Sequence, residues 1–216
     1  MIAAVVLATS LTGLAATAHA QSTSFLIART GVRADSPHLG TYRYLEFFQT
    51  HGDWVLPDVG ALDFYHDNYR ELFLGGGRTL YSGKQVTWVE ELYFAQAIGS
   101  AAQSARYFWP WTLVDVRFSA AFSGEVVYFP YVPINQSAHF QHLLERAKLE
   151  YTPSKVWKFG AGYGGYQYTG QPWQNKPFLT TTISTNVGAF ELWLQKVPGG
   201  SQVQLRYQKG WQHTAH

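Results

Sequence analysis

Apolar and polar side chains alternate with a period of two along much of the second half of the chain. The alternation runs through residues 114–122, 190–195 and 203–208. In the last of these segments Val203, Leu205 and Tyr207 fall on one face, and Gln204, Arg206 and Gln208 fall on the other. Only an extended strand turns successive side chains to opposite faces. The pattern therefore predicts β-sheet with one apolar face and one polar face.

Turn-forming residues divide the chain into eleven predicted strands. Clusters of Gly, Pro, Asn and Asp, among them residues 56–60 and the glycines at 75–77, are typical of turns. The strands predicted between such clusters are residues 25–33, 41–50, 62–74, 86–98, 112–122, 125–132, 140–151, 156–168, 178–185, 190–196 and 202–209, with residues 107–111 extending the fifth. Residues 89–97 and 139–149 also fit a helix. A strand is favoured for 139–149 because a turn at residues 152–155 leads into an evident partner strand.

Residues 1–20 are typical of a cleaved export signal. Residues 2–18 are apolar or small and uncharged, and Ala18-His19-Ala20 has the small-x-small form of a signal-peptidase site. A transmembrane helix is the alternative, but Thr9 and Ser10 interrupt the apolar run. We expect residues 21–216 to form a single exported domain. Because the chain has no cysteine, this domain must be stable without disulfides.

The apolar face of the sheet can be buried in a soluble sandwich or turned to lipid in a membrane barrel. Charged residues make up 14% of the chain, against about 25% in an average soluble domain. Aromatic residues gather near predicted strand ends, at residues 107–111, 128–131 and 166–173, where a girdle at the membrane interface would lie. Both observations favour the barrel. Its interior would then be lined by polar side chains of mixed charge, namely Asp115, Arg117, Arg146, Lys148, Glu150 and Arg206.

The last predicted strand, residues 203–211, ends close to an aromatic residue, Trp211. It resembles the C-terminal signal by which bacterial outer-membrane β-barrels are recognised for insertion. In that class the aromatic residue is the last one, whereas here residues 212–216 follow it. The resemblance implies an all-β, antiparallel transmembrane barrel of about 10–12 strands in the outer membrane, with membrane lipid as a partner. A net charge of +2 without a run of Lys or Arg argues against nucleic acid.

Other motifs that could carry chemistry have structural explanations. Residues 160–165 match G-x-G-x-x-G, but the residues that follow cannot begin a helix, so glycines that make room for bulky neighbours are the better interpretation. His139 and His142 on one strand would project to opposite faces, as would Glu90 and Glu91, so neither pair predicts a metal site or an acid–base couple. A polar cluster at residues 63–69 fits a strand end or loop.

Ser119, Ser137, His139 and His142 are the residues that could serve a hydrolase, but no G-x-S-x-G motif is present. We therefore expect no enzymatic activity, no cofactor and no metal. The predicted function is a small porin-like or structural barrel that passes small polar or anionic solutes through a slightly cationic interior. A lipid-modifying hydrolase in the same barrel, and a soluble exported β-sandwich that binds carbohydrate, are the alternatives. The sequence contains no signal for an oligomeric state.

Overall fold

The computed structural model describes residues 22–34, 40–64, 68–99 and 104–213, so the predicted export signal at residues 1–20 lies outside the described residues. The described residues form twelve strands. They are β1 (Ser22–Arg33), β2 (Gly40–His51), β3 (Trp54–Phe64), β4 (Tyr69–Ser82), β5 (Val86–Ile98), β6 (Arg106–Arg117), β7 (Phe122–Pro133), β8 (Gln141–Tyr151), β9 (Trp157–Tyr168), β10 (Gln174–Thr185), β11 (Gly188–Val197) and β12 (Gly200–His213).

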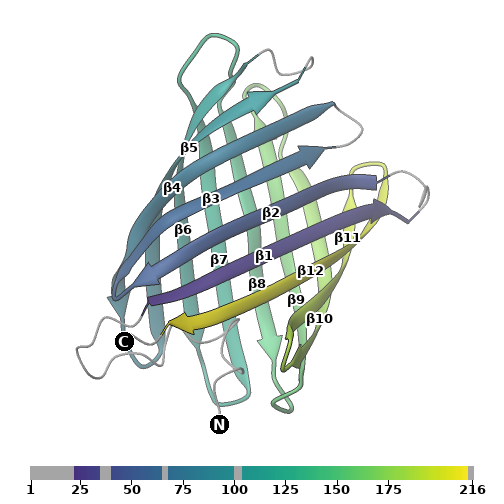
Figure 1. Ribbon diagram of the computed structural model, residues 1–216. Helices are drawn as coiled ribbons and strands as arrows, with labels where there is room; N and C mark the ends of the chain where they lie inside the picture. The colour runs from purple at the N-terminus through teal and green to yellow at the C-terminus, as the bar shows by residue number, and fades with distance from the viewer. Residues whose placement is uncertain (1–21, 35–39, 65–67, 100–103, 214–216) are drawn as a thin grey trace.

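The twelve strands close into one antiparallel barrel. Each strand pairs with the strands before and after it in the sequence, and β1 pairs with β12 to complete the ring (Figure 1). The predicted antiparallel barrel of 10–12 strands is therefore confirmed. No helix among the described residues is long and apolar enough to span a membrane.

The two ends of the barrel differ in the length of their connections. At the end where Ser22 pairs with His213, the strands are joined by residues 52–53, 83–85, 118–121, 152–156 and 186–187. At the other end the connections are residues 34–39, 65–68, 99–105, 134–140, 169–173 and 198–199, which are longer on average. We refer to these as the short-turn end and the loop end.

The described residues contain one strand more than the eleven that the sequence predicts. Residues 56–60 were predicted as a turn, and residues 62–74 as one strand, but the structure has β3 at residues 54–64 and β4 from residue 69. The turn-like composition has another cause. Asp58 points into the barrel, where its carboxylate accepts a hydrogen bond from Tyr93 at 2.7 Å, and the pairing of β3 with β4 shifts in register between Val55 and Asp58, on either side of Pro57.

The glycines at 75–77 also lie inside a strand, β4, and not in a turn. A Cβ atom on Gly75 would lie 2.4 Å from the ring of Tyr93, which packs over it. The predicted strand at residues 112–122 is likewise divided, since β6 ends at Arg117 and Phe122 begins β7. By contrast, β5 has the predicted bounds.

Burial along β5 shows which face of the sheet lies inside. Val89, Glu91 and Tyr93 are buried. Leu92 and Phe94, which alternate with them along the strand, are exposed. The same holds around the ring, where the outer faces of β2 to β12 expose large apolar side chains, including Leu45, Val59, Leu72, Leu92, Phe108, Val126, Leu149, Phe159, Leu179, Leu192 and Leu205. An apolar exterior of this extent suits lipid and not water. The predicted orientation of the two faces is thus the one observed.

The predicted aromatic girdle was largely misplaced. Tyr107, Trp109, Phe129 and Tyr131 point inward and form a buried cluster near the loop end together with Phe73 and Tyr93. The exposed aromatic side chains near the short-turn end come from other segments, namely Trp54, Tyr81, Trp88, Phe122, Tyr151, Trp157 and Trp211. A sequence position near a strand end does not reveal which way the side chain points, because that depends on the register.

Candidate functional site

Charged side chains from five strands meet inside the barrel, between its middle and its short-turn end. We call them the ion-pair network, and its members are Arg29 of β1, Glu125 of β7, Glu145, Arg146, Lys148 and Glu150 of β8, Glu191 of β11 and Arg206 of β12. Lys148 is at its centre, with Nζ 2.8 Å from Glu125, 2.9 Å from Glu191 and 3.2 Å from Glu150. The side chain of Lys148 is only 2% exposed.

A β-bulge in β8 gives the network two adjacent charges on the same face. The pairing of β8 with both neighbouring strands shifts in register around Glu145, so that Glu145 and Arg146 both point inward. A regular strand would send one of them to the lipid. Arg146 pairs with Glu125 at 2.8 Å and with Glu145 at 3.0 Å.

Most of the residues predicted to line the interior belong to this network. Arg146, Lys148, Glu150 and Arg206 are members of it. Asp115 lies on the inward face of β6 opposite Glu125, half-buried. Arg117 ends β6 at the short-turn end and is exposed.

Four members of the network were not predicted, and they change its charge. Arg29, Glu125, Glu145 and Glu191 bring the network to four basic and four acidic side chains, so it is balanced and not slightly cationic as expected. The alternation around residues 190–195 did place Glu191 on the polar face. Glu145 could not have been found this way, because the bulge breaks the alternation.

Side chains occupy the interior at the level of the network. Arg29 crosses from β1 to β8, and its guanidinium lies 5.6 Å from the ring centre of Tyr44 and 5.7 Å from that of Trp193. Trp193 is 1% exposed, and Lys148 approaches the same ring to 5.8 Å. Buried charges lose several kcal/mol of hydration free energy each, and only close partners recover it. The network is therefore held together as a unit.

A second polar group lies on the opposite wall. Tyr93 donates to Asp58 at 2.7 Å and also contacts Glu91, while Tyr44 donates to Glu46 at 2.9 Å and Tyr69 donates to Glu71. The hydrogen-bond donors to these carboxylates are tyrosine hydroxyl groups and not basic side chains. No group of three or more metal-ligating side chains with suitable geometry occurs within the described residues.

The motifs set aside in the sequence have structural roles here. Gly162 faces the interior within β9, where an added Cβ would lie 2.4 Å from the ring of Phe178. Glu90 and Glu91 point to opposite faces, with Glu90 accepting hydrogen bonds from Trp88 and Thr112 on the outside. His66 and Asp67 lie outside the described residues.

The serine and histidine residues considered for a hydrolase do not converge. Ser119 accepts hydrogen bonds from the backbone of its own turn, and His142 contacts the hydroxyl of Tyr128 at 2.6 Å on the outer wall. Ser24 does lie 2.8 Å from His213, but the other side-chain partner of its hydroxyl is the amide of Gln49. That amide donates to the serine, whereas a catalytic triad has a third group that orients the histidine.

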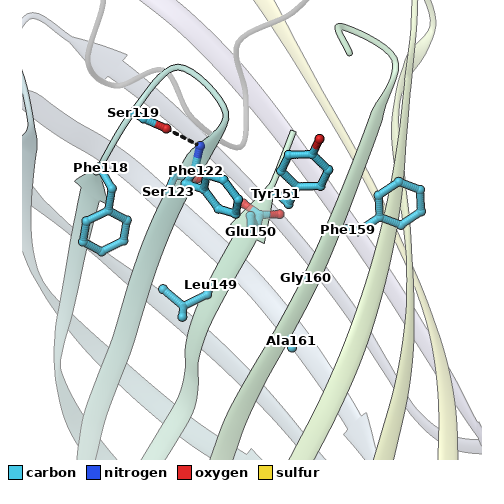
Figure 2. A pocket seen from close by; sticks show the side chains of 10 residues that line it. All are labelled: Phe118, Ser119, Phe122, Ser123, Leu149, Glu150, Tyr151, Phe159, Gly160 and Ala161. Carbon is cyan, nitrogen blue, oxygen red and sulfur yellow. Dashed lines mark hydrogen bonds between the residues drawn. The ribbon is translucent and has the colours of Figure 1, made fainter. Parts of the chain in front are cut away.

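A groove of about 770 Å³ lies at the barrel wall near the short-turn end, and Glu150 of the network is among the residues that line it. Figure 2 shows its lining around the turn between β6 and β7, with Phe118, Phe122, Leu149, Tyr151 and Phe159 as its large apolar side chains. Leu149, Tyr151 and Phe159 are among the exposed residues of the outer face. These apolar side chains of the groove therefore belong to the surface that faces lipid.

Comparisons with known proteins give matches by structure alone. No family model and no curated protein sequence matches the chain. The KdgM porin superposes with a TM-score of 0.59 at 12% sequence identity, and the match covers 89% of this chain and 99% of the KdgM chain. A second structure of the KdgM porin is described as a complex with disordered oligogalacturonate. The NanC porin gives 0.58 at 8% identity over 88% of this chain and 100% of that one.

An outer-membrane channel from Pseudomonas putida F1, COG4313, gives a TM-score of 0.50 at 8% identity, covering 91% of this chain and 97% of that one. At such low identities these likenesses concern the fold. The chain forms a closed twelve-strand ring with an apolar exterior, and it matches these porins in structure. It therefore has the fold of the small bacterial outer-membrane porins.

Proposed function

We propose that this protein is a narrow, non-enzymatic channel of the bacterial outer membrane that passes small anionic solutes. The observation that carries the proposal is a series of inward-facing basic side chains that extends along the barrel. It runs from Arg33 near the loop end through Arg29, Arg206, Arg146 and Lys148 to Lys158 and Arg117 at the short-turn end. Guanidinium groups bind carboxylates through paired hydrogen bonds, which suits transfer of an acidic solute from one to the next.

The acidic members of the network keep these basic groups in place while no solute is present. Buried charges without partners would be unstable, so a narrow polar interior has to be paired internally. Twelve strands lie between small barrels filled by side chains and wide water-filled porins, so passage requires some of these side chains to move. The complex of the KdgM porin with oligogalacturonate suggests that acidic sugars are suitable solutes to test.

The lengths of the connections support an orientation. In outer-membrane barrels the short turns face the periplasm and the longer loops face outward. We therefore place the short-turn end, with its outer ring of Trp54, Trp88, Trp157 and Trp211, at the periplasmic interface.

The proposal is tested by liposome swelling with galactose and two derivatives of similar size and opposite charge, galacturonate and galactosamine. Galacturonate should enter faster than galactose, and galactosamine should enter most slowly. Arg206→Gln should reduce the preference for galacturonate, while Arg70→Gln on the outer wall, whose side chain is 66% exposed, should leave it unchanged. Equal rates for the three sugars, or no swelling with protein shown to be folded by heat-modifiable mobility on gels, would contradict the proposal.

A further inference from the structure

We propose that Glu145 is an internal ligand of an anion-binding site formed by Arg29 and Arg146, and that a carboxylate group of the solute binds there in its place. This inference rests on the proposed channel function and extends it by naming the residue that competes with the solute. Glu145 would thereby set both the affinity of the site and the charge selectivity of the channel.

The two arginines reach the same oxygen atom from different walls. Oε1 of Glu145 lies 2.6 Å from Nη2 of Arg29 on β1 and 3.0 Å from Nη1 of Arg146 on β8. In the ring, β1 and β8 are separated by β9 to β12 on one side and by β2 to β7 on the other, so the Arg29–Glu145 pair spans the interior. A solute that moves along the barrel axis must pass this contact.

The Arg29 side of the site is built before any solute arrives. Its guanidinium lies near the rings of Tyr44 and Trp193, and its Nη1 contacts the hydroxyl of Tyr42 at 3.3 Å. These neighbours come from β2 and β11, on both sides of β1. A guanidinium held in this way loses little conformational entropy when an anion binds.

The site has unused capacity for hydrogen bonds. Nε of Arg29 is buried and has no hydrogen-bond partner among the described residues, although Nη1 and Nη2 of the same group are both engaged. Nε of Arg206 is also buried and has no hydrogen-bond partner among the described residues. Buried donors of a charged group are normally satisfied. A mobile carboxylate can approach the Nε edge of a guanidinium and accept two parallel hydrogen bonds, which Glu145 does not do here.

The backbone indicates that Glu145 is an addition to an otherwise regular strand. On one side of it Leu144 points outward and Leu143 inward, and on the other side Arg146 points inward and Ala147 outward. Without Glu145 the alternation would be continuous. Gly164 on β9 makes room for the bulge, since a Cβ there would lie 2.7 Å from the carbonyl oxygen of Glu145. The bulge thus contributes one extra inward carboxylate and leaves all other side chains in place.

Removing this carboxylate changes the charge of the network. With Glu145 present the basic and acidic members are equal in number, and with Glu145→Gln the network carries one excess positive charge. The amide keeps the size of the side chain but no longer competes as an anion. We therefore expect the vacated guanidinium groups to accept a solute carboxylate more readily.

The experiment uses single channels of the full mature protein in planar bilayers under a KCl gradient, with free galacturonate as a blocker. Glu145→Gln should shift the reversal potential toward anion selectivity and lower the half-blocking concentration of galacturonate by about tenfold, the equivalent of one hydrogen bond to a charged group. Glu145→Asp, whose shorter side chain keeps the charge but cannot keep both contacts, should give a smaller shift. The matched control is Glu90→Gln on the outer wall, which should behave as the wild type.

The outcomes separate the two proposals. If wild-type channels prefer anions but Glu145→Gln and Glu145→Asp, both folded by gel mobility, show the wild-type reversal potential and galacturonate block, the internal ligand is refuted and the channel function stands. If folded wild-type and folded Glu145→Gln proteins conduct no ions at all, both proposals are refuted.

Discussion

Lys148→Met is expected to destabilise the barrel strongly, because it removes the central cation of a buried network. The substitution keeps most of the side-chain volume but leaves Glu125, Glu150 and Glu191 without the ammonium group that lies 2.8–3.2 Å from them. Breaking a buried ion pair by removing one partner costs about 3–5 kcal/mol. Two of the three carboxylates keep another partner, Arg146 at 2.8 Å for Glu125 and Arg206 at 3.7 Å for Glu191. We therefore expect a loss near the lower bound, about 3 kcal/mol.

The measurement is equilibrium urea unfolding in detergent micelles, followed by tryptophan fluorescence. Lys196→Met is the matched control, because Lys196 is exposed on the outer face of β11, and its effect should stay within about 0.5 kcal/mol. Combining Lys148→Met with Glu191→Gln should cost less than the sum of the two single changes, since they remove the same interaction. A loss below about 1 kcal/mol for Lys148→Met, or strict additivity in the double variant, would refute the view that these charges stabilise the fold as a unit.

Three further changes test the interior, the close packing at a glycine and the lipid face. Trp193→Ala should lower the free energy of unfolding by about 3–5 kcal/mol in the same assay, because the indole ring is almost completely buried and its centre lies 4.2 Å from that of the Phe178 ring. Gly162→Ala should cost about 1–3 kcal/mol, since the added methyl group would overlap the Phe178 ring and the backbone oxygen of Ala147, and a neutral result would show that both can move aside. Leu92→Arg on the outer face should reduce folding into lipid vesicles by about 2–4 kcal/mol, and wild-type insertion by this variant would mean that Leu92 does not face the bilayer core.

The sequence was sufficient to predict the architecture because the period of two is dictated by the backbone of each strand. The strand β5 has the predicted bounds, and β11, which is regular throughout, has the predicted faces. The failures occurred where a residue with a turn-like identity has a role in packing. Asp58 is a buried hydrogen-bond acceptor, and Gly75 makes space for a tyrosine ring. Composition alone cannot distinguish these roles from a turn.

The candidate site was predicted in part for a related reason. Arg146, Lys148 and Glu150 follow the alternation within one strand, so their common direction could be read from the sequence. Their partners come from strands far away in the chain, such as Arg29, which is 116 positions from Glu145. Which distant strands face each other depends on the number of strands and the stagger of the ring. A bulge, which adds one residue to one strand, leaves no periodic signal at all.

The pairing of β1 with β12 has a consequence for how the protein is made. Twelve residue pairs join the first strand to the last, from Ser22 with His213 to Arg33 with Gln202. Until β12 has been synthesised, the hydrogen-bonding edge of β1 has no native partner, and an open edge of this length can pair with other chains. Contacts between residues so distant in sequence also form slowly. The chain must therefore be kept apart from other chains until its last strand is available, and a premature stop within β12 would leave the ring open and not merely shorter.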